Sequence, residues 1–245
     1  MKGIAGLHER LSKITNDPKE YSDPGIATQL PFPSMNVIPS RFSINGGTFL
    51  YMGREMFAQI WSTWLQVKDD DQRRQAIYVY GTPGYGKSHM LAALACLLVR
   101  QGEQVVYLPD CFAMLRDPLQ YLQVALLFAI QDASSRQQIH SSKTVNDLAS
   151  FCVHYKSGRL CIIADQLNAL DPDPHGRDVS TDKAKSELLA ILQRISHTHI
   201  YITSASANHE SARYLQKKET GDQKIALLGG MTTVRHLLCT MMLNL

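Results

Sequence analysis

Residues 81–88 read GTPGYGKS, and this combination of glycines, lysine and serine suits phosphate binding. The spacing fits G-x-x-x-x-G-K-[ST], in which backbone N–H groups wrap around phosphate oxygens. Glycine is needed in such a loop because it adopts dihedral angles that a Cβ forbids. Lys87 would reach the β- and γ-phosphates, and the Ser88 hydroxyl would ligate Mg²⁺. The predicted cofactor-binding residues are Gly81, Thr82, Pro83, Gly84, Tyr85, Gly86, Lys87 and Ser88.

A glycine-rich turn that matches this pattern by accident is the alternative interpretation. The surrounding sequence favours a phosphate loop, because AIYVY (76–80) resembles a buried strand and a helical pattern begins near Lys87. A helix start would add free N–H groups and the positive end of its dipole. The sequence contains no guanine-recognition motif of the NKxD type, so ATP is the favoured nucleotide.

An acid that completes a Mg²⁺ site is expected at the end of another buried strand, and LCIIADQLNAL supplies Asp165. Ser88 and Asp165 are the predicted metal ligands, although an aspartate can also end a strand for turn formation alone. In ATPases of the additional-strand class, a glutamate that polarises the attacking water follows this aspartate. Here the residue is Gln166, whose amide orients water but takes up no proton. Slow or partner-triggered hydrolysis is therefore predicted.

The run HIYITS (199–204) is followed by further polar residues that could contact the γ-phosphate or the attacking water. Ser204 is preferred for this position, called sensor 1 in AAA+ proteins, and Ser206 and Asn208 are further candidates. Simple loop capping is the alternative. The predicted catalytic residues are thus Lys87, Asp165, Gln166 and Ser204. Candidates for an arginine finger, each more typical of a solvated side chain, are Arg177, Arg194 and Arg213.

Two further clusters carry weaker signals. DPDPHGRD (171–178) gathers acids and a histidine, but its composition is typical of an exposed turn rather than of a metal site. The five cysteines form no CxxC pair and lie mostly in apolar stretches, which predicts reduced thiols.

Four short apolar runs are typical of strands buried on both faces of a parallel sheet. They are AIYVY (76–80), VVYLP (105–109), LCIIAD (160–165) and HIYITS (199–204). Helical patterns separate them at 87–101, roughly 116–132, 144–156 and 183–196, and GREMFAQIWSTWLQV predicts a helix before them. This alternation predicts right-handed crossovers. The predicted fold is α/β, a three-layer P-loop NTPase with a mainly parallel sheet of the additional-strand class, AAA+/STAND-like.

The chain divides into three predicted parts. Residues 1–45 contain half of the ten prolines and no sustained periodicity, so an extended or disordered lead-in is expected. Residues 46–210 form the predicted P-loop NTPase core, and residues 211–245 form a partial C-terminal segment. The helical lid of such domains is expected to be missing or incomplete.

The composition, 44% hydrophobic and 19% charged, is that of an ordinary soluble globular protein. A formal net charge of +3 is too small to indicate nucleic-acid binding by itself. The start MKGIAGLHERLSK lacks the apolar segment of a signal peptide, and no apolar run approaches the ~18 residues that cross a bilayer. A cytoplasmic or nuclear location without membrane contact is expected.

Several segments outside the phosphate loop resemble a known family. FLYMGREMF, AIYVYGTPGYGKSHMLAALACLL, IIADQLNAL, ITSASAN and KKETGDQKIALLGGM resemble, in this order, the NTPase region of Crinkler (CRN-type) effector proteins, over about residues 46–235. The resemblance implies an AAA+- or STAND-like P-loop module, in which a glutamine after the metal-binding aspartate belongs to the pattern. Some members are secreted effectors that act in host nuclei. The nuclease-like domain that often follows in that family is not carried over to this chain.

The segment MGREMF carries a second, partial resemblance. Arg54 is similar to the GR-containing entry motif of STAND and origin-recognition ATPases, whereas Phe57 stands where those proteins have an acid. Packing in the core of a helix is the alternative role for this segment.

Taken together, the residues predict an ATP-binding domain that uses ATP and Mg²⁺, with slow or partner-triggered hydrolysis. The alternatives are a non-hydrolysing, ATP-gated switch that binds a protein or nucleic-acid partner, and a truncated, inactive copy. Lys87, Ser88 and Asp165 favour activity, whereas Gln166 favours the alternatives. The oligomeric state is left open.

Overall fold

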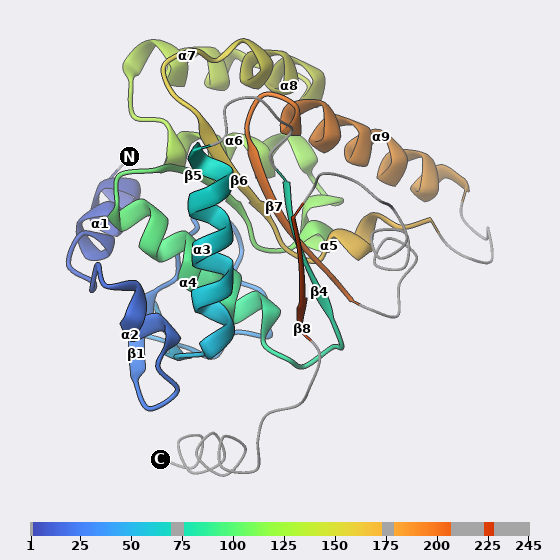
Figure 1. The fold of residues 1–245 in the computed structure, drawn as a ribbon. Helices are drawn as coiled ribbons and strands as arrows, with labels where there is room; N and C mark the ends of the chain where they lie inside the picture. Colours follow the sequence, from blue (N-terminus) through green and yellow to red (C-terminus); the bar gives the residue numbers. More distant parts are fainter. Residues whose placement is uncertain (1, 70–75, 173–178, 207–222, 228–245) are drawn as a thin grey trace.

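The computed structural model describes residues 2–69, 76–172, 179–206 and 223–227. Five strands form the central sheet, and every neighbouring pair is parallel (Figure 1). They are β4 (Ala76–Gly81), β5 (Gln104–Leu108), β6 (Leu160–Ala164), β7 (Ile200–Ser206) and β8 (Gln223–Leu227). The strand order is β5-β6-β7-β4-β8, so β7 lies between β4 and β6. This is the strand arrangement of the additional-strand class.

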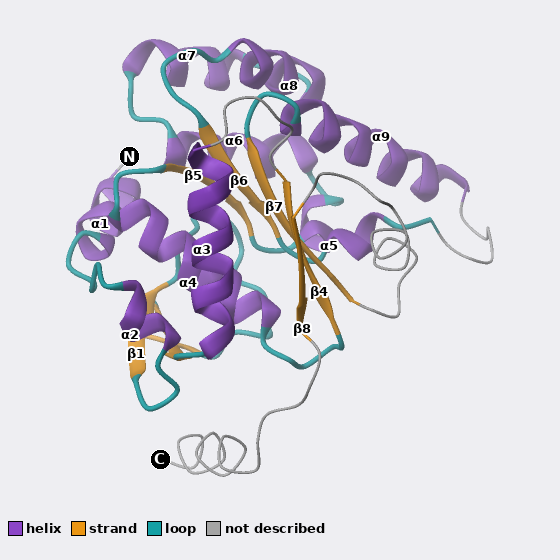
Figure 2. Cartoon of the chain, in the orientation of Figure 1, coloured by secondary structure: helices purple, strands orange, loops and turns teal. Residues whose placement is uncertain are grey.

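Helices cover both faces of this sheet and give the three layers of an α/β fold (Figure 2). One face packs against α3 (Glu55–Asp69) and α4 (Lys87–Arg100). The other packs against α6 (Pro118–Ala129), α8 (Val145–His154) and α9 (Val179–Ser196). The shorter α5 (Cys111–Met114), α7 (Ala133–Ser141) and the 3-10 helix η1 (Leu167–Leu170) adjoin this second layer. The predicted three-layer α/β fold with a parallel sheet is confirmed.

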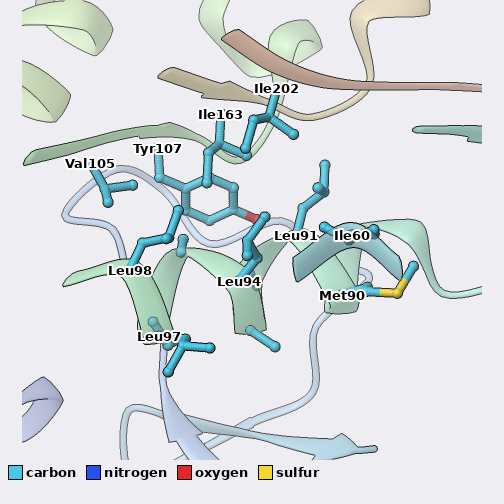
Figure 3. Close-up of a cluster of buried hydrophobic side chains, with 14 of the residues drawn as sticks. Ile60, Met90, Leu91, Leu94, Leu97, Leu98, Val105, Tyr107, Ile163 and Ile202 are labelled. Atoms are coloured by element: carbon cyan, nitrogen blue, oxygen red, sulfur yellow. The ribbon is translucent and has the colours of Figure 1, made fainter. Parts of the chain in front are cut away.

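The strands are apolar on both sides because both faces of the sheet are covered. In β6, Cys161 and Ile163 belong to the core on the α3–α4 side, and Ile162 and Ala164 to the core on the opposite side. Figure 3 shows the first of these cores, where leucines of α4 meet side chains of β5, β6 and β7. The absence of polar alternation in these runs reflects this double burial.

The N-terminal residues are folded, so the predicted extended or disordered lead-in over 1–45 is wrong for residues 2–45. They form α1 (Lys2–Leu11), α2 (Pro18–Ser22), β1 (Ala27–Pro31) and β2 (Ile44–Asn45), and β3 (Thr48–Met52) follows them. The three strands make an antiparallel sheet in the order β1-β3-β2. Leu11, Tyr21 and Leu30 are buried in the same core as α4, which supplies the free energy that holds this segment on the domain.

Two of the prolines of this segment, Pro18 and Pro31, are part of regular elements, so proline content here does not indicate disorder. Pro18 opens α2 directly after the N-cap Asp17, a position where the missing proline N–H costs no hydrogen bond. Pro31 ends β1. The boundary predicted at residue 45 is therefore not a boundary of the fold.

The sheet also extends past residue 210, where the predicted core ends. Strand β8 pairs with β4 along Ile77–Gly81, and Ile225 and Leu227 are buried. The predicted partial segment 211–245 thus contributes the strand beside the phosphate loop. The expectation about a lid concerns residues that lie outside those that the structure describes.

Candidate functional site

The loop predicted to bind phosphate connects the carboxyl end of β4 to the start of α4. Gly86 is the N-cap of α4, and Lys87 is the first residue of the helix. The Lys87 Nζ donates to the carbonyl oxygens of Gly81 and Thr82, at 2.8 Å each. The ammonium therefore lies against the loop's own backbone, at the place where the phosphate groups of a nucleotide would be enclosed.

Arg54 attaches the segment before α3 to this loop. Its Nη1 donates to the Tyr85 carbonyl at 2.8 Å. A Cβ at Gly86, where φ is 77°, would collide with the Arg54 guanidinium. The backbone conformation favours glycine at 86, whereas the Arg54 side chain could move to make room for a Cβ. Arg54 contacts the loop, and Phe57 is fully buried in the core, as the alternative role of core packing expects. A part for Arg54 in nucleotide entry stays a prediction.

Asp165 directly follows β6 and is fully buried. Its Oδ1 accepts from the Ser204 hydroxyl and from the Gln166 backbone N–H, the latter at 3.0 Å. Because β6 and β7 are parallel neighbours, the ends of both strands lie at the same edge of the sheet. The structure thus brings together the predicted residues Asp165, Gln166 and Ser204.

Gln166 adopts a left-handed backbone conformation, with φ 60° and ψ 47°. It is the one residue other than glycine with positive φ in the described part of the chain. Its N–H also donates to the Ser204 Oγ at 3.1 Å. Such strain concentrates where a side chain must be held in one place for function.

Two charged residues that the sequence interpretation missed complete this edge. Arg41, from the segment between β1 and β2, lies 3.0 Å from Asp165 Oδ2 through its Nη2 and also donates to the Pro109 carbonyl. Its Nη1 lies 3.6 Å from Asp110 Oδ2, after β5. Local sequence patterns could not predict the pairing of Arg41 with Asp165, because the two residues have a sequence separation of 124.

The residues predicted to hold Mg²⁺ fit that ion chemically. Mg²⁺ prefers oxygen ligands, and Ser88 and Asp165 provide a hydroxyl and a carboxylate. Burial lowers the pKa of Lys87 and of His89, the two neighbours of Ser88, and the negative charge of Asp165 opposes this lowering in both. Asp165 Oδ2 already lies against a cation, the Arg41 guanidinium. The carboxylate is therefore arranged with one oxygen toward positive charge.

His89, on α4, contacts the ring of Phe42 at a centroid distance of 4.5 Å. Burial, followed by the positive charge of Arg54, lowers its pKa to about 4. The ring is therefore neutral at pH 7 in the folded protein. In the unfolded chain the ordinary value is 6.5, so the unfolded state binds the extra proton first as the pH falls.

Because this pKa is lowered on folding, we expect the protein to lose stability as the pH falls from about 6.5 toward 4. Between pH 7 and pH 5, His89 should account for about 2 kcal/mol of the decrease in the free energy of unfolding. Urea unfolding of wild type and His89→Gln in metal-free buffer measures this difference. Equal pH dependence in both proteins would contradict the prediction.

The remaining candidate residues have less defined places. Arg194, on α9, donates to the Ser150 hydroxyl at 3.0 Å, away from the loop. Arg177, Asn208 and Arg213 lie outside the described residues, as does the side chain of Ser206 and most of the cluster 171–178. Among the described residues, no three or more His, Cys, Asp or Glu side chains form a group that could hold a metal ion. Cys96, Cys111, Cys152 and Cys161 are free and buried, as predicted.

No helix among the described residues has the length and apolar character needed to cross a membrane. No family model and no curated protein matches the chain. Among solved structures, it is similar to an Aeropyrum pernix ORC2 protein in ADPNP–ADP complexes, with 14% identity and a TM-score of 0.46 over 89% of this chain and 56% of that chain. A DnaB-like replicative helicase, described with its interactions with primase, is 12% identical, with a TM-score of 0.31 over 66% of this chain and 50% of that one. The chain thus spans about half the length of these two structures.

Proposed function

We propose that this chain is an ATP-binding P-loop domain in which ATP hydrolysis is slow or depends on a partner. The observation that carries the proposal is the convergence of two predicted sites at one edge of the sheet. The loop at the end of β4 holds Lys87 against its own carbonyls, and the end of β6 holds the buried Asp165. In open parallel sheets, ligands bind at the carboxyl ends of the strands.

Each residue would have a separate task in nucleotide binding. The N–H groups of the loop and of the first turn of α4 would donate to phosphate oxygens. Lys87 would exchange the Gly81 and Thr82 carbonyls for the β- and γ-phosphates. Ser88 and Asp165 would hold Mg²⁺. When bound, this ion neutralises charge on the phosphate oxygens.

The residues around Asp165 favour slow turnover. Gln166 stands where an additional-strand ATPase has its general base, and an amide takes up no proton from the attacking water. The Gln166 backbone N–H donates to Asp165 and to Ser204, which holds the Gln166 Cα in a fixed position beside Asp165, the proposed metal ligand. In our proposal the Gln166 amide orients water. Ser204 holds Asp165 through its single O–H donor, and its hydroxyl would have to turn away from Asp165 to donate to the γ-phosphate.

The same glutamine supports a second candidate function, an ATP-gated switch without significant hydrolysis. Such a domain would change its affinity for a protein or nucleic-acid partner when ATP binds, and Gln166 would keep the bound state long-lived. A switch binds ATP with Lys87 and Asp165 as an ATPase does, but releases almost no phosphate. The two candidates therefore differ in phosphate release and agree in ATP binding.

We also propose that the module is of the Crinkler NTPase type, with AAA+/STAND-like chemistry. Support comes from the segments that resemble this family, among them IIADQLNAL, in which the glutamine follows the aspartate. Effector function and secretion would follow only from that resemblance. Identification of the chain's location in or outside its cell by tagged expression tests this part.

We expect the wild-type domain to bind ATP in the presence of Mg²⁺, and Lys87→Ala to bind it roughly tenfold to a hundredfold more weakly. This decrease in ATP affinity is what we expect when the charge-assisted hydrogen bonds between one ammonium group and phosphate oxygens are removed. Calorimetric titration with ATP and GTP measures binding, and a phosphate-release assay measures turnover.

Lys143→Ala is the matched control, because Lys143 is an exposed lysine in the loop before α8. It should leave ATP affinity and turnover unchanged. Equal ATP affinity in wild type and Lys87→Ala would contradict the assignment of the site. If the wild-type domain binds ATP but releases no phosphate, the ATP-gated switch is the better description of its function.

A further inference from the structure

Arg41 is the cation closest to the carboxylate that is expected to bind metal. Its guanidinium bridges the carboxyl ends of β5 and β6, where it meets the Pro109 carbonyl, Asp110 and Asp165. The Asp165 side chain is fully buried, whereas that of Arg41 is 24% exposed. The Arg41 guanidinium therefore lies between the buried Asp165 carboxylate and the solvent.

The two oxygens of Asp165 have different partners. Oδ1 accepts from Ser204 and from the Gln166 N–H, both of which belong to the site itself. Oδ2 faces Arg41 at 3.0 Å. A metal ion that binds to Asp165 needs a carboxylate oxygen that is not already neutralised, and Oδ2 is the oxygen held by a cation.

We propose that Arg41 is a displaceable counter-ion of Asp165, which competes with the metal ion of the bound nucleotide for Oδ2. This inference rests on the proposed function. In the nucleotide-free state, the guanidinium compensates the buried negative charge. Binding of the metal–ATP complex then requires Arg41 to release Asp165. The residue thereby raises the metal concentration at which the site is filled.

The surroundings of Arg41 favour an exchange by rotation of its side chain. Asp110, whose side chain is 17% exposed, already lies 3.6 Å from Nη1 and can keep the guanidinium after it leaves Asp165. The Nε of Arg41 is buried and has no acceptor among the described residues, so the present position leaves one donor unused.

The backbone at Arg41 is held in place while the side chain moves. The next residue, Phe42, is buried and packs edge-on against Phe32 and Phe49, at centroid distances of 5.0 and 5.4 Å. Arg41 therefore reaches the site from a fixed point in the segment between β1 and β2. The exchange needs no rearrangement of the N-terminal sheet.

Direct metal titration tests the proposal, with Mn²⁺ as the probe in place of Mg²⁺. The protein is first loaded with a non-hydrolysable ATP analogue, and free Mn²⁺ is measured by electron paramagnetic resonance. We expect Arg41→Ala to bind Mn²⁺ roughly tenfold more tightly than wild type, the equivalent of one lost competing hydrogen bond between charged groups. Arg41→Lys should fall between the two, because a lysine keeps the charge but not the planar fork.

Thermal unfolding provides a second readout that does not depend on activity. Without metal, Arg41→Ala should melt at a lower temperature than wild type, because Asp165 is left buried without a counter-ion. Mn²⁺ with the analogue should raise its melting temperature more than that of wild type. If Arg41→Ala folds under no condition, the Arg41→Lys titration decides, and a wild-type Mn²⁺ affinity in that variant would overturn the proposal.

Arg100→Ala is the matched control. Arg100 also ties the N-terminal segment to the core, through the Ile14 carbonyl, but it lies at the far end of α4 from Ser88, about 20 Å away along the helix axis. Its Mn²⁺ affinity should equal that of wild type. If wild type binds the analogue but Arg41→Ala binds Mn²⁺ equally or more weakly, only the role of Arg41 is overturned. If wild type binds no nucleotide, the proposed function itself fails.

Discussion

Gln166→Glu is expected to raise the rate of phosphate release by roughly two orders of magnitude over wild type, while ATP affinity changes little. A positioned general base contributes about 10²–10⁴-fold to such reactions. The substitution adds a carboxylate of nearly the same size at the residue that follows Asp165, the proposed metal ligand. A phosphate-release assay at saturating ATP and Mg²⁺ measures the effect.

The backbone at position 166 is suited to present either side chain in the same place. Its left-handed conformation is fixed by two hydrogen bonds of the N–H group, to Asp165 Oδ1 and to Ser204 Oγ. Neither bond involves the side chain, so glutamate can replace glutamine without disturbing them. Both residues are unbranched at Cβ and tolerate this backbone conformation equally.

Gln166→Met separates the gain of a base from the loss of an amide. Methionine has a similar length but neither accepts a proton nor orients water, so its turnover should not exceed that of wild type. In Gln166→Glu, turnover should increase with pH through the pKa of the new carboxylate. Unchanged turnover with intact ATP binding would mean that position 166 does not face the reacting water, and the switch would then be the better description.

Four strands of the central sheet and the loop between β4 and α4 could be predicted from sequence because their signals are local. Each of β4, β5, β6 and β7 is a continuous apolar run, and GTPGYGKS follows the first of them directly. Asp165 and Ser204 could be named for the same reason, since each lies at the end of such a run. Parallel pairing then brings the ends of β6 and β7 together.

The N-terminal segment and Arg41 could not be predicted because their partners are distant in sequence. Leu11 and Leu30 become buried only when the segment packs on α4, and Arg41 meets Asp165 at a sequence separation of 124. Proline content suggested disorder, whereas Pro18 and Pro31 occupy positions in regular elements where proline is tolerated. β8 is five residues long, with a buried Ile225 and Leu227 among half-exposed neighbours, so its run was too short to separate from a loop.

Gly81→Ala is expected to destabilise the protein by about 4 kcal/mol and to weaken ATP binding strongly. Gly81 ends β4, pairs with Leu227 of β8 and has φ 149°. A Cβ at this position would overlap the Leu227 backbone carbonyl, which cannot rotate away as a side chain would. The expected cost combines this overlap with a backbone conformation that alanine rarely adopts. Urea unfolding and calorimetric titration with ATP measure the two effects.

The consequences of Gly81→Ala should be concentrated at the edge of the sheet. Among the described strands, β8 lies at the end of the sheet and pairs with β4, so the overlap can be relieved by separating β8 from β4 without unfolding the rest of the sheet. Faster hydrogen exchange at the β8 amides would report this separation. The Gly81 carbonyl also accepts from Lys87, which links the position of this residue to the lysine proposed to bind phosphate.

Gly102→Ala is the control that separates the two causes. Gly102 has φ 86° but would place its Cβ in open space, so it retains the backbone strain without the overlap. Gly102→Ala should lower the free energy of unfolding by about 1 kcal/mol and leave ATP affinity unchanged. If both variants lose the same stability, the approach of Leu227 to Gly81 is not what requires glycine there. If Gly81→Ala alone loses both stability and ATP binding, the pairing of β8 with β4 is what holds the phosphate loop in shape.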